Sequence, residues 1–180
     1  MDGAVSEVGG LVVCWLLGAI FALALRHKVT AWPRFKAAFG AYQIVAERYV
    51  GLVAGGLVVA ESVTLISLLL LRPVGLLLAA GLLTTYGVAI AVNVRRGRRQ
   101  IDCGCGDEPT PVSWTLVARN MLLISLSLGA YILQPVGYSL SWGVAVVAFA
   151  AAMVAFGIYS AVEQLIANRG RYERLWLGVS

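Results

Sequence analysis

The sequence has little charge for its length: 13% of its 180 residues are charged and 60% are hydrophobic. A soluble domain usually carries about a quarter charged residues, because polar groups have to cover its surface. This shortage excludes a water-soluble globular domain and indicates an integral membrane protein. The net charge of +5 does not indicate nucleic-acid binding, because the basic residues lie at the ends of apolar runs, where they orient a membrane protein.

Side chains that commonly carry out catalysis are also scarce. The one histidine, His27, lies between Arg26 and Lys28 at the end of an apolar run, which is typical of a residue at the membrane interface. The sequence shows no Ser-His-Asp set, no glycine-rich phosphate-binding loop and no histidine-rich metal run. These absences argue against the common hydrolase and nucleotide-binding classes. The most informative residues that remain are Cys103 and Cys105.

Five apolar runs are long enough to cross a bilayer, because roughly 20 helical residues span a hydrocarbon core about 30 Å thick. We predict membrane spans at about 8–25, 49–71, 74–94, 112–133 and 142–166. Backbone groups in lipid have to bond within their own segment, so each span should be helical. The sequence therefore predicts an all-α, polytopic transmembrane bundle in a single domain, 1–180, with a four-helix core and a fifth span packed alongside.

The distribution of lysine and arginine predicts the orientation of these spans. Twelve of the 14 basic residues lie between spans one and two, between spans three and four, or after span five. With five spans these segments share one face of the membrane, and the opposite face has only Arg72. Because cytoplasmic segments are enriched in lysine and arginine, we place this face in the cytoplasm of a bacterial inner membrane, with the N-terminus outside.

The most informative polar segment is the run RRGRRQIDCGCGDEPT at 95–110, which we call the thiol hairpin. Gly104 allows backbone conformations that bring the sulfur atoms of Cys103 and Cys105 together. A disulfide across so short a loop would be strained and easily reduced, which suits exchange chemistry better than a structural cross-link. The charge distribution places this hairpin on the cytoplasmic side.

The next segment carries the signals of a helix start. Thr110 and Pro111 are the residue types of an N-cap and a first helical position, so we predict that the fourth span begins near them. The positive end of that helix and the neighbouring arginines would favour a thiolate, whereas the nearby acidic residues would oppose it.

Three interpretations of the two hairpin cysteines remain open. The first is thiol–disulfide exchange. The second is a site for a soft metal such as Cu(I) or Zn(II) on Cys103 and Cys105, although a closed zinc site needs four ligands and only Cys14 and His27 remain. The third is a connecting loop with incidental thiols in a protein that only positions a partner.

Polar residues inside the spans suggest a second feature. Glu61 lies near the middle of the second span and Arg119 lies within the fourth, and such residues should face the bundle interior. We predict that the two side chains meet, and that Asn120 and Asn93 complete a polar cluster near the thiols. This cluster is either a proton or redox pocket, open to a quinone, or a polar contact between helices. Cys14, in the first span, is either a redox relay or a small apolar residue.

The thiol hairpin together with the following SWTLVARNMLL resembles the MauE family of membrane proteins, which is related to the DoxX-like group. The residues that match the family pattern are Cys103, Gly104, Cys105, Arg119 and Asn120. Gly106 and Asp107 depart from it, because the family often has an aromatic residue and a glycine there. The resemblance covers roughly 8–133 and implies a membrane component of methylamine utilisation, or of a related maturation system, that acts with a thioredoxin-like partner.

We therefore expect a membrane thiol–disulfide redox component, with Cys103 and Cys105 as the exchanging pair and Gly104, Glu61, Arg119 and Asn120 in support. The alternatives are a soft-metal binding or transport protein and a non-catalytic scaffold subunit. The predicted cytoplasmic position of the thiol hairpin conflicts with a role in forming disulfides of exported proteins, because those disulfides form on the opposite face of the membrane.

Overall fold

The computed structural model describes residues 2–98, 100–103, 110–133 and 141–176. The elements in chain order are α1 (Asp2–Thr30), α2 (Trp32–Ala41), the short 3-10 helix η1 (Glu47–Tyr49), α3 (Val50–Leu70), α4 (Arg72–Arg95), α5 (Trp114–Ile132) and α6 (Trp142–Trp176). The described part of the chain contains helices and one isolated antiparallel bridge, but no strand. The predicted all-α fold is therefore confirmed.

Five segments are long and apolar enough to cross a membrane, as predicted. They are Ser6–Thr30, Glu47–Leu70, Arg72–Arg95, Trp114–Ile132 and Trp142–Asn168. The first extends beyond its predicted end because α1 continues to Thr30, and Lys28 in its last turn is only 3% exposed and packs inside the protein. The outer surface is apolar, with Leu52 76% exposed and Ile132 75% exposed, which is unfavourable in water and favourable in lipid.

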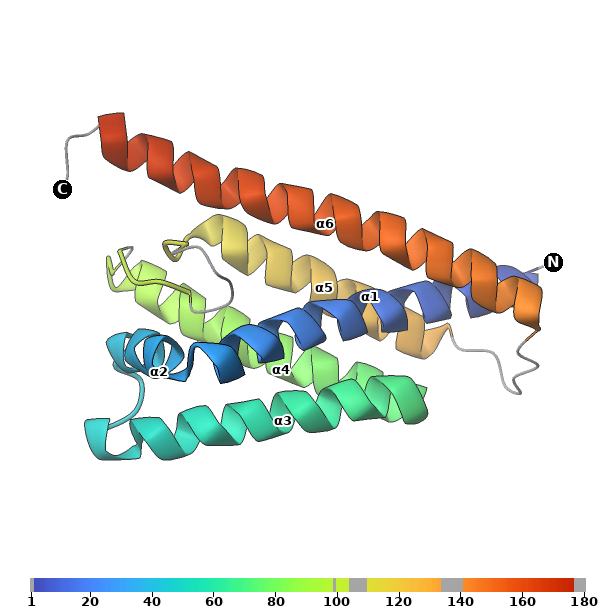
Figure 1. Ribbon diagram of the computed structural model, residues 1–180, viewed down its shortest axis with the longest axis horizontal. Coiled ribbons are helices and arrows are strands. Elements are labelled where there is room, and N and C mark those ends of the chain that lie inside the picture. The colour runs from blue at the N-terminus through green and yellow to red at the C-terminus, as the bar shows by residue number, and fades with distance from the viewer. Residues whose placement is uncertain (1, 99, 104–109, 134–140, 177–180) are drawn as a thin grey trace.

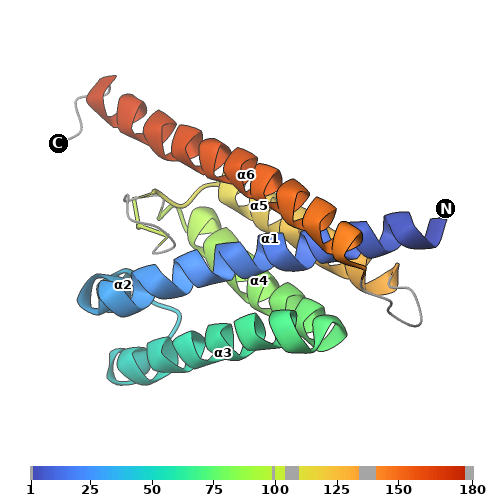
Figure 2. The same ribbon diagram turned by 45° about the vertical axis from the view of Figure 1, so that its right-hand side comes forward.

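α1, α3, α4 and α5 form the four-helix core, in which α4 packs between α3 and α5 (Figure 1). α6 packs alongside this core, mainly against α1 (Figure 2). The central buried cluster consists of Cys14, Leu17, Phe21, Leu68, Leu76, Ala79, Leu83, Leu123 and Ala130. The predicted arrangement of four core helices and a fifth alongside is therefore confirmed.

The connection between α3 and α4 brings two helices into very close contact. A Cβ atom added to Gly75 would lie 2.4 Å from the backbone nitrogen of Leu68, so only glycine fits at this position. Nearby, the Ser127 hydroxyl of α5 donates a 2.8 Å hydrogen bond to the Leu76 carbonyl of α4. Together these contacts fix α3, α4 and α5 at this end of the bundle.

The two ends of the bundle differ in what they carry. α2, the connection from α4 to α5 and the C-terminal part of α6 lie at one end, and the N-terminus and the α3–α4 turn lie at the other (Figure 1). The three basic segments of the sequence thus lie at the same end, as five antiparallel spans require. The thiol hairpin belongs to this basic end.

Candidate functional site

The thiol hairpin starts from a well-defined helix end. Gly97 follows α4 with φ +76°, a left-handed conformation that glycine adopts without steric cost. The Gly97 N–H bonds the Val94 carbonyl at 3.1 Å and the Arg98 N–H bonds the Asn93 carbonyl at 3.0 Å. This pair of bonds is a Schellman motif, which ends the helix and turns the chain toward the hairpin.

The described flanks of the hairpin form a short antiparallel stem. The Cys103 N–H bonds the Thr110 carbonyl at 2.9 Å, and the Val112 N–H bonds the Ile101 carbonyl at 3.0 Å. The Asp102 carboxylate accepts a 3.2 Å hydrogen bond from the Thr110 N–H. It also forms an ion pair with Arg34 of α2, at 3.3 Å. The stem is thus fixed both along its length and to the neighbouring helix.

This stem shows that the predicted start of the fourth span is wrong. Thr110 and Pro111 do not open the helix, because Thr110 is bonded to Cys103 and Pro111 is bridged to Asp102 in the stem. α5 begins at Trp114 instead, after Ser113 in an extended conformation (φ −149°, ψ 164°). Pairing between the two flanks of the hairpin therefore overrides the local helix-start signal.

Cys103 lies at the end of this stem and is partly buried. It packs beside the cluster formed by Tyr42, Ile90, Val94, Val112 and Leu116, and its carbonyl accepts a 3.5 Å hydrogen bond from the Tyr42 hydroxyl. The other two predicted residues of the hairpin, Gly104 and Cys105, lie outside the described residues. The predicted approach of the two sulfur atoms, and the alternative metal site on them, therefore remain predictions.

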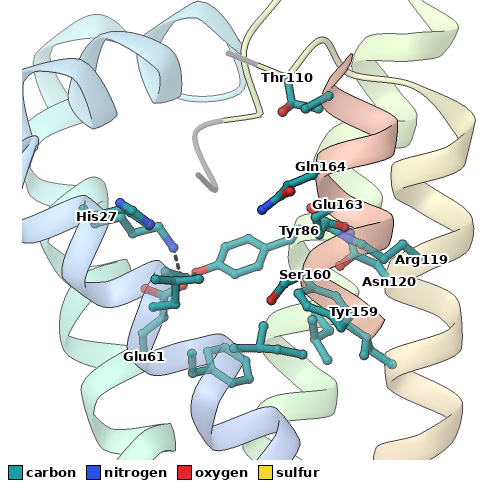
Figure 3. A pocket seen from close by; sticks show the side chains of 18 of the residues that line it. His27, Glu61, Tyr86, Thr110, Arg119, Asn120, Tyr159, Ser160, Glu163 and Gln164 are labelled. Carbon is teal, nitrogen blue, oxygen red and sulfur yellow. Dashed lines mark hydrogen bonds and ion pairs between the residues drawn. The ribbon is translucent and has the colours of Figure 1, made fainter. Parts of the chain in front are cut away.

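A cavity of about 570 Å³ lies next to the stem, and Thr110 forms part of its wall. α1, α3, α4, α5 and α6 all contribute to the lining, so the cavity lies inside the bundle (Figure 3). Its wall includes the polar side chains of Lys28, Glu61, Tyr86, Arg119, Asn120 and Glu163. Three predicted site residues, Glu61, Arg119 and Asn120, thus line one cavity beside the thiol hairpin.

One wall of the cavity carries a buried charge cluster. The Lys28 ammonium of α1 forms an ion pair with the Glu61 carboxylate of α3, and the two side chains are 4% and 1% exposed. The Tyr86 hydroxyl of α4 donates a 2.7 Å hydrogen bond to the same carboxylate oxygen, Oε1. The Lys28 ammonium also lies 5.0 Å from the centre of the Tyr86 ring and 5.3 Å from that of Phe35. These contacts stabilise a carboxylate that would otherwise be costly in the membrane.

The opposite wall carries a second ion pair, between Arg119 of α5 and Glu163 of α6, at 2.7 Å. The predicted pairing of Glu61 with Arg119 is therefore wrong. α3 and α5 pack on different sides of α4, so Glu61 finds its partners on α1 and α4 while Arg119 is bonded by α6. Figure 3 shows the two groups on opposite sides of the cavity.

The two asparagines of the predicted polar cluster have different environments. Asn120 is 1% exposed and lines the cavity, whereas Asn93 is fully buried, does not line it, and donates to the Ala89 carbonyl of its own helix at 3.0 Å. Cys14 belongs to the central apolar cluster, roughly 20 Å along α1 from Lys28. It thus lies in a different cluster from Cys103, among apolar neighbours.

Sequence reasoning missed Lys28, Tyr86 and Glu163, which are the partners of Glu61 and Arg119 in the cavity. Glu163 carried a usable signal, because it is an acidic residue inside the predicted fifth span. Lys28 was grouped with the charged end of the first span, and Tyr86 had no signal, since tyrosine is common in membrane helices. Chemically, the cavity wall offers two carboxylates, two cations, an imidazole and two phenols in a low-dielectric interior, which suits proton transfer and recognition of a polar head group.

These features define the class: a polytopic, all-helical membrane protein with a charged cavity beside a cysteine-containing hairpin. The family described as methylamine utilisation protein MauE matches residues 6–134 of the sequence. The chain belongs to the MauE family, so the resemblance seen in the motif is confirmed. α6 lies beyond the matched residues, although it supplies Glu163 and much of one cavity wall.

Curated relatives support this assignment. The chain is 36% identical to methylamine utilization protein MauE of Paracoccus versutus over 123 residues, which is 66% of either protein. It is 37% identical to the protein of the same name in Methylophilus methylotrophus over 101 residues, 53% of this chain and 52% of the relative. It is 54% identical to that of Paracoccus denitrificans over 52 residues, 28% of each. No solved structure is significantly similar to the chain.

Proposed function

We propose that this chain is a membrane component of thiol–disulfide exchange that acts through Cys103 and Cys105. The observation that carries the proposal is the position of Cys103. It ends a stem held by hydrogen bonds at the wall of a charged cavity, next to Thr110, which lines that cavity. A cysteine used only for packing would need neither the stem nor the cavity. Partial burial leaves the Cys103 side chain within reach of a partner.

The exchange itself balances between the chain and a partner. A thiolate of the hairpin attacks a disulfide of a thioredoxin-like protein, giving a mixed disulfide, and the second hairpin thiol then resolves it. Two S–H bonds of the hairpin break and one S–S bond forms. The partner receives two electrons and two protons, and its disulfide becomes a dithiol. The reverse reaction reduces the hairpin.

We place the protein in a bacterial inner membrane with the hairpin toward the cytoplasm and the N-terminus outside. The support is the collection of basic segments at the end of the bundle that holds the hairpin. The name of the relatives suggests methylamine utilisation as the setting, and we propose a role there in the maturation or redox handling of another protein. Thr110 of the hairpin and Glu61 near the middle of α3 line the same cavity, which supports a transfer of protons between the hairpin and the interior of the bundle.

The test is to trap the mixed disulfide in membranes. A Cys105→Ser variant should hold a partner protein in a mixed disulfide with Cys103. This adduct should appear on a non-reducing gel and disappear when a reductant is added. A Cys14→Ala variant is the matched control and should behave like the unaltered chain, because Cys14 lies in the apolar core. If no single-cysteine variant traps a protein, thiol exchange is wrong. If the purified protein instead contains stoichiometric copper or zinc, and the metal is lost when Cys103 and Cys105 are replaced, the soft-metal alternative is supported.

Membrane-impermeant maleimide tests the orientation separately. It should label Cys103 from the cytoplasmic side of inverted vesicles and leave it unlabelled in intact cells. Labelling in intact cells would reverse the proposed orientation without affecting the exchange chemistry.

A further inference from the structure

The cavity beside the thiol hairpin has the size and surface of a small-molecule site. Its volume of about 570 Å³ falls in the range typical of such sites. Apolar side chains of Ile20, Phe21, Leu83 and Leu123 line it together with the polar residues described above. Leu23, also in the wall, is 38% exposed and lies within the first membrane-spanning segment. A ligand that reaches the cavity past this side chain comes from the lipid and has to be soluble in the membrane.

The charges of the cavity select an uncharged ligand. Lys28 compensates Glu61 on one wall, and Arg119 compensates Glu163 on the other. A ligand with a net charge would meet no uncompensated counter-charge, and it would be costly to bring from lipid into the bundle.

Buried polar atoms in the wall then define the head group. Among the described residues, no hydrogen-bond partner is found for Glu61 Oε2, Glu163 Oε1 or Asn120 Nδ2. Glu61 and Asn120 are each only 1% exposed, and a buried polar atom without a partner is costly. The carboxylate oxygens need hydrogen-bond donors on opposite walls (Figure 3), and the Asn120 amide needs an acceptor. A ring that carries two hydroxyl groups on opposite sides supplies all three.

We infer that this cavity binds a membrane-soluble hydroquinone, with one hydroxyl donating to Glu61, the other donating to Glu163, and a hydroxyl oxygen accepting from Asn120. The apolar residues hold the ring and its tail. Tyr86 and Lys28 act as positioning residues, because they hold Glu61 through its other oxygen, Oε1.

The role of this ligand in electron transfer rests on the proposed function. The oxidised form, a quinone, would accept the two electrons and two protons released when the dithiol of the hairpin becomes a disulfide. Because the carboxylates bind hydroxyl groups, the site stabilises the quinol over the quinone. The bound quinone is thereby a stronger oxidant than the free one, which favours oxidation of the thiols.

The experiment measures binding to the full chain in lipid nanodiscs by equilibrium dialysis. The probes are a decyl-substituted benzohydroquinone and its dimethyl ether, which has the same ring but no hydroxyl donor. We expect the ether to bind at least about tenfold more weakly, since each lost hydrogen bond to a charged group is worth that much. Equal affinity for the two probes, or no binding of the hydroquinone, overturns the inference.

Matched variants locate the site. Asn120→Leu should weaken hydroquinone binding about fivefold or more, whereas Asn93→Leu, an equally buried asparagine outside the cavity, should leave it unchanged. Equal effects of the two substitutions overturn the assignment to this cavity. If Asn120→Leu does not fold, the comparison of the two probes on the unaltered chain still shows whether the hydroquinone binds through its hydroxyl groups.

Binding and thiol exchange are tested independently. A Cys103→Ser, Cys105→Ser variant should bind the hydroquinone like the unaltered chain, because the described contacts involve no thiol. Binding without a trapped mixed disulfide would leave the cavity ligand standing and remove the proposed function. A trapped mixed disulfide without hydroquinone binding would support the proposed function and overturn the inference about the cavity ligand.

Discussion

Lys28 at the end of α1 and Glu61 in the middle of α3 form a buried ion pair, with side chains 4% and 1% exposed. Removing one partner leaves the other charged and buried without compensation, which typically costs about 3–5 kcal/mol. We expect Lys28→Met to lower the free energy of unfolding by about this amount, measured by denaturant titration in detergent micelles. The control is Arg26→Met, which removes an exposed cation from the same turn and should have little effect.

The double substitution Lys28→Met with Glu61→Leu tests the pairing directly. It removes both charges, so its cost should be clearly smaller than the sum of the two single costs. Additive costs would show that the two charges do not depend on each other. A companion cycle of Glu61→Leu with Arg119→Leu should be close to additive, because these residues have different partners.

The Tyr86 hydroxyl bonds the same carboxylate at 2.7 Å. Tyr86→Phe should reduce the free energy of unfolding by about 1.5–3 kcal/mol, the usual value for a hydrogen bond to a charged group. Tyr131→Phe removes a hydroxyl from a tyrosine that is 40% exposed and should change stability much less. Equal effects of the two substitutions would contradict a stabilising role of the Tyr86 bond.

Arg119 and Glu163 join the four-helix core to α6, outside the residues matched by the family. Arg119→Glu places two like charges together and should weaken the attachment of α6. The reciprocal change Glu163→Arg in the same chain should recover about half or more of the lost stability, because the pair is only partly exposed. Thermal unfolding in detergent measures both effects, and no recovery in the double variant would rule out the pair as the connection.

Gly75 permits the close contact at the α3–α4 turn. Gly75→Ala should destabilise the fold by about 2 kcal/mol or more, since its Cβ would lie 2.4 Å from a backbone atom that cannot move easily. Gly81→Ala, one of the glycines with no atom within 4 Å of an added Cβ, should instead be neutral or stabilising by about 0.5–1 kcal/mol. Expression level and thermal midpoint in detergent compare the two, and a harmless Gly75→Ala would refute the close contact.

The stem of the thiol hairpin depends on Asp102, which bonds the Thr110 N–H at 3.2 Å. Asp102→Ala should raise the rate of maleimide reaction at Cys103 about fivefold, because roughly 1 kcal/mol of local stability is lost. The measurement uses a Cys14→Ala, Cys105→Ser background so that a single thiol reacts. Arg34→Ala is the control: it removes the 3.3 Å ion pair with Asp102, in which Arg34 is 46% exposed, and it leaves the Asp102–Thr110 hydrogen bond in place, so it should have a small effect.

The start of α5 shows where a local signal fails. Thr110 followed by Pro111 is a sound helix-start pattern, yet both residues are held in the hairpin stem by Cys103 and Asp102. Pairing with a segment earlier in the chain satisfies the same backbone groups that a helix would, so the local helix-start preference does not determine where α5 begins. The Gly97 turn, by contrast, is a local feature at the end of α4 and needs no distant partner.

The amino-acid sequence alone determined the membrane class, the five spans, the common end of the basic segments and the family. Each of these depends on properties summed along the chain, such as apolar length, charge count and motif spacing. Only the tertiary structure decided that Glu61 pairs with Lys28 and Tyr86, that Arg119 pairs with Glu163, and that a cavity lies between them. The physical reason is that a buried charge specifies its need for a partner, whereas the crossing and rotation of the helices select which partner it meets.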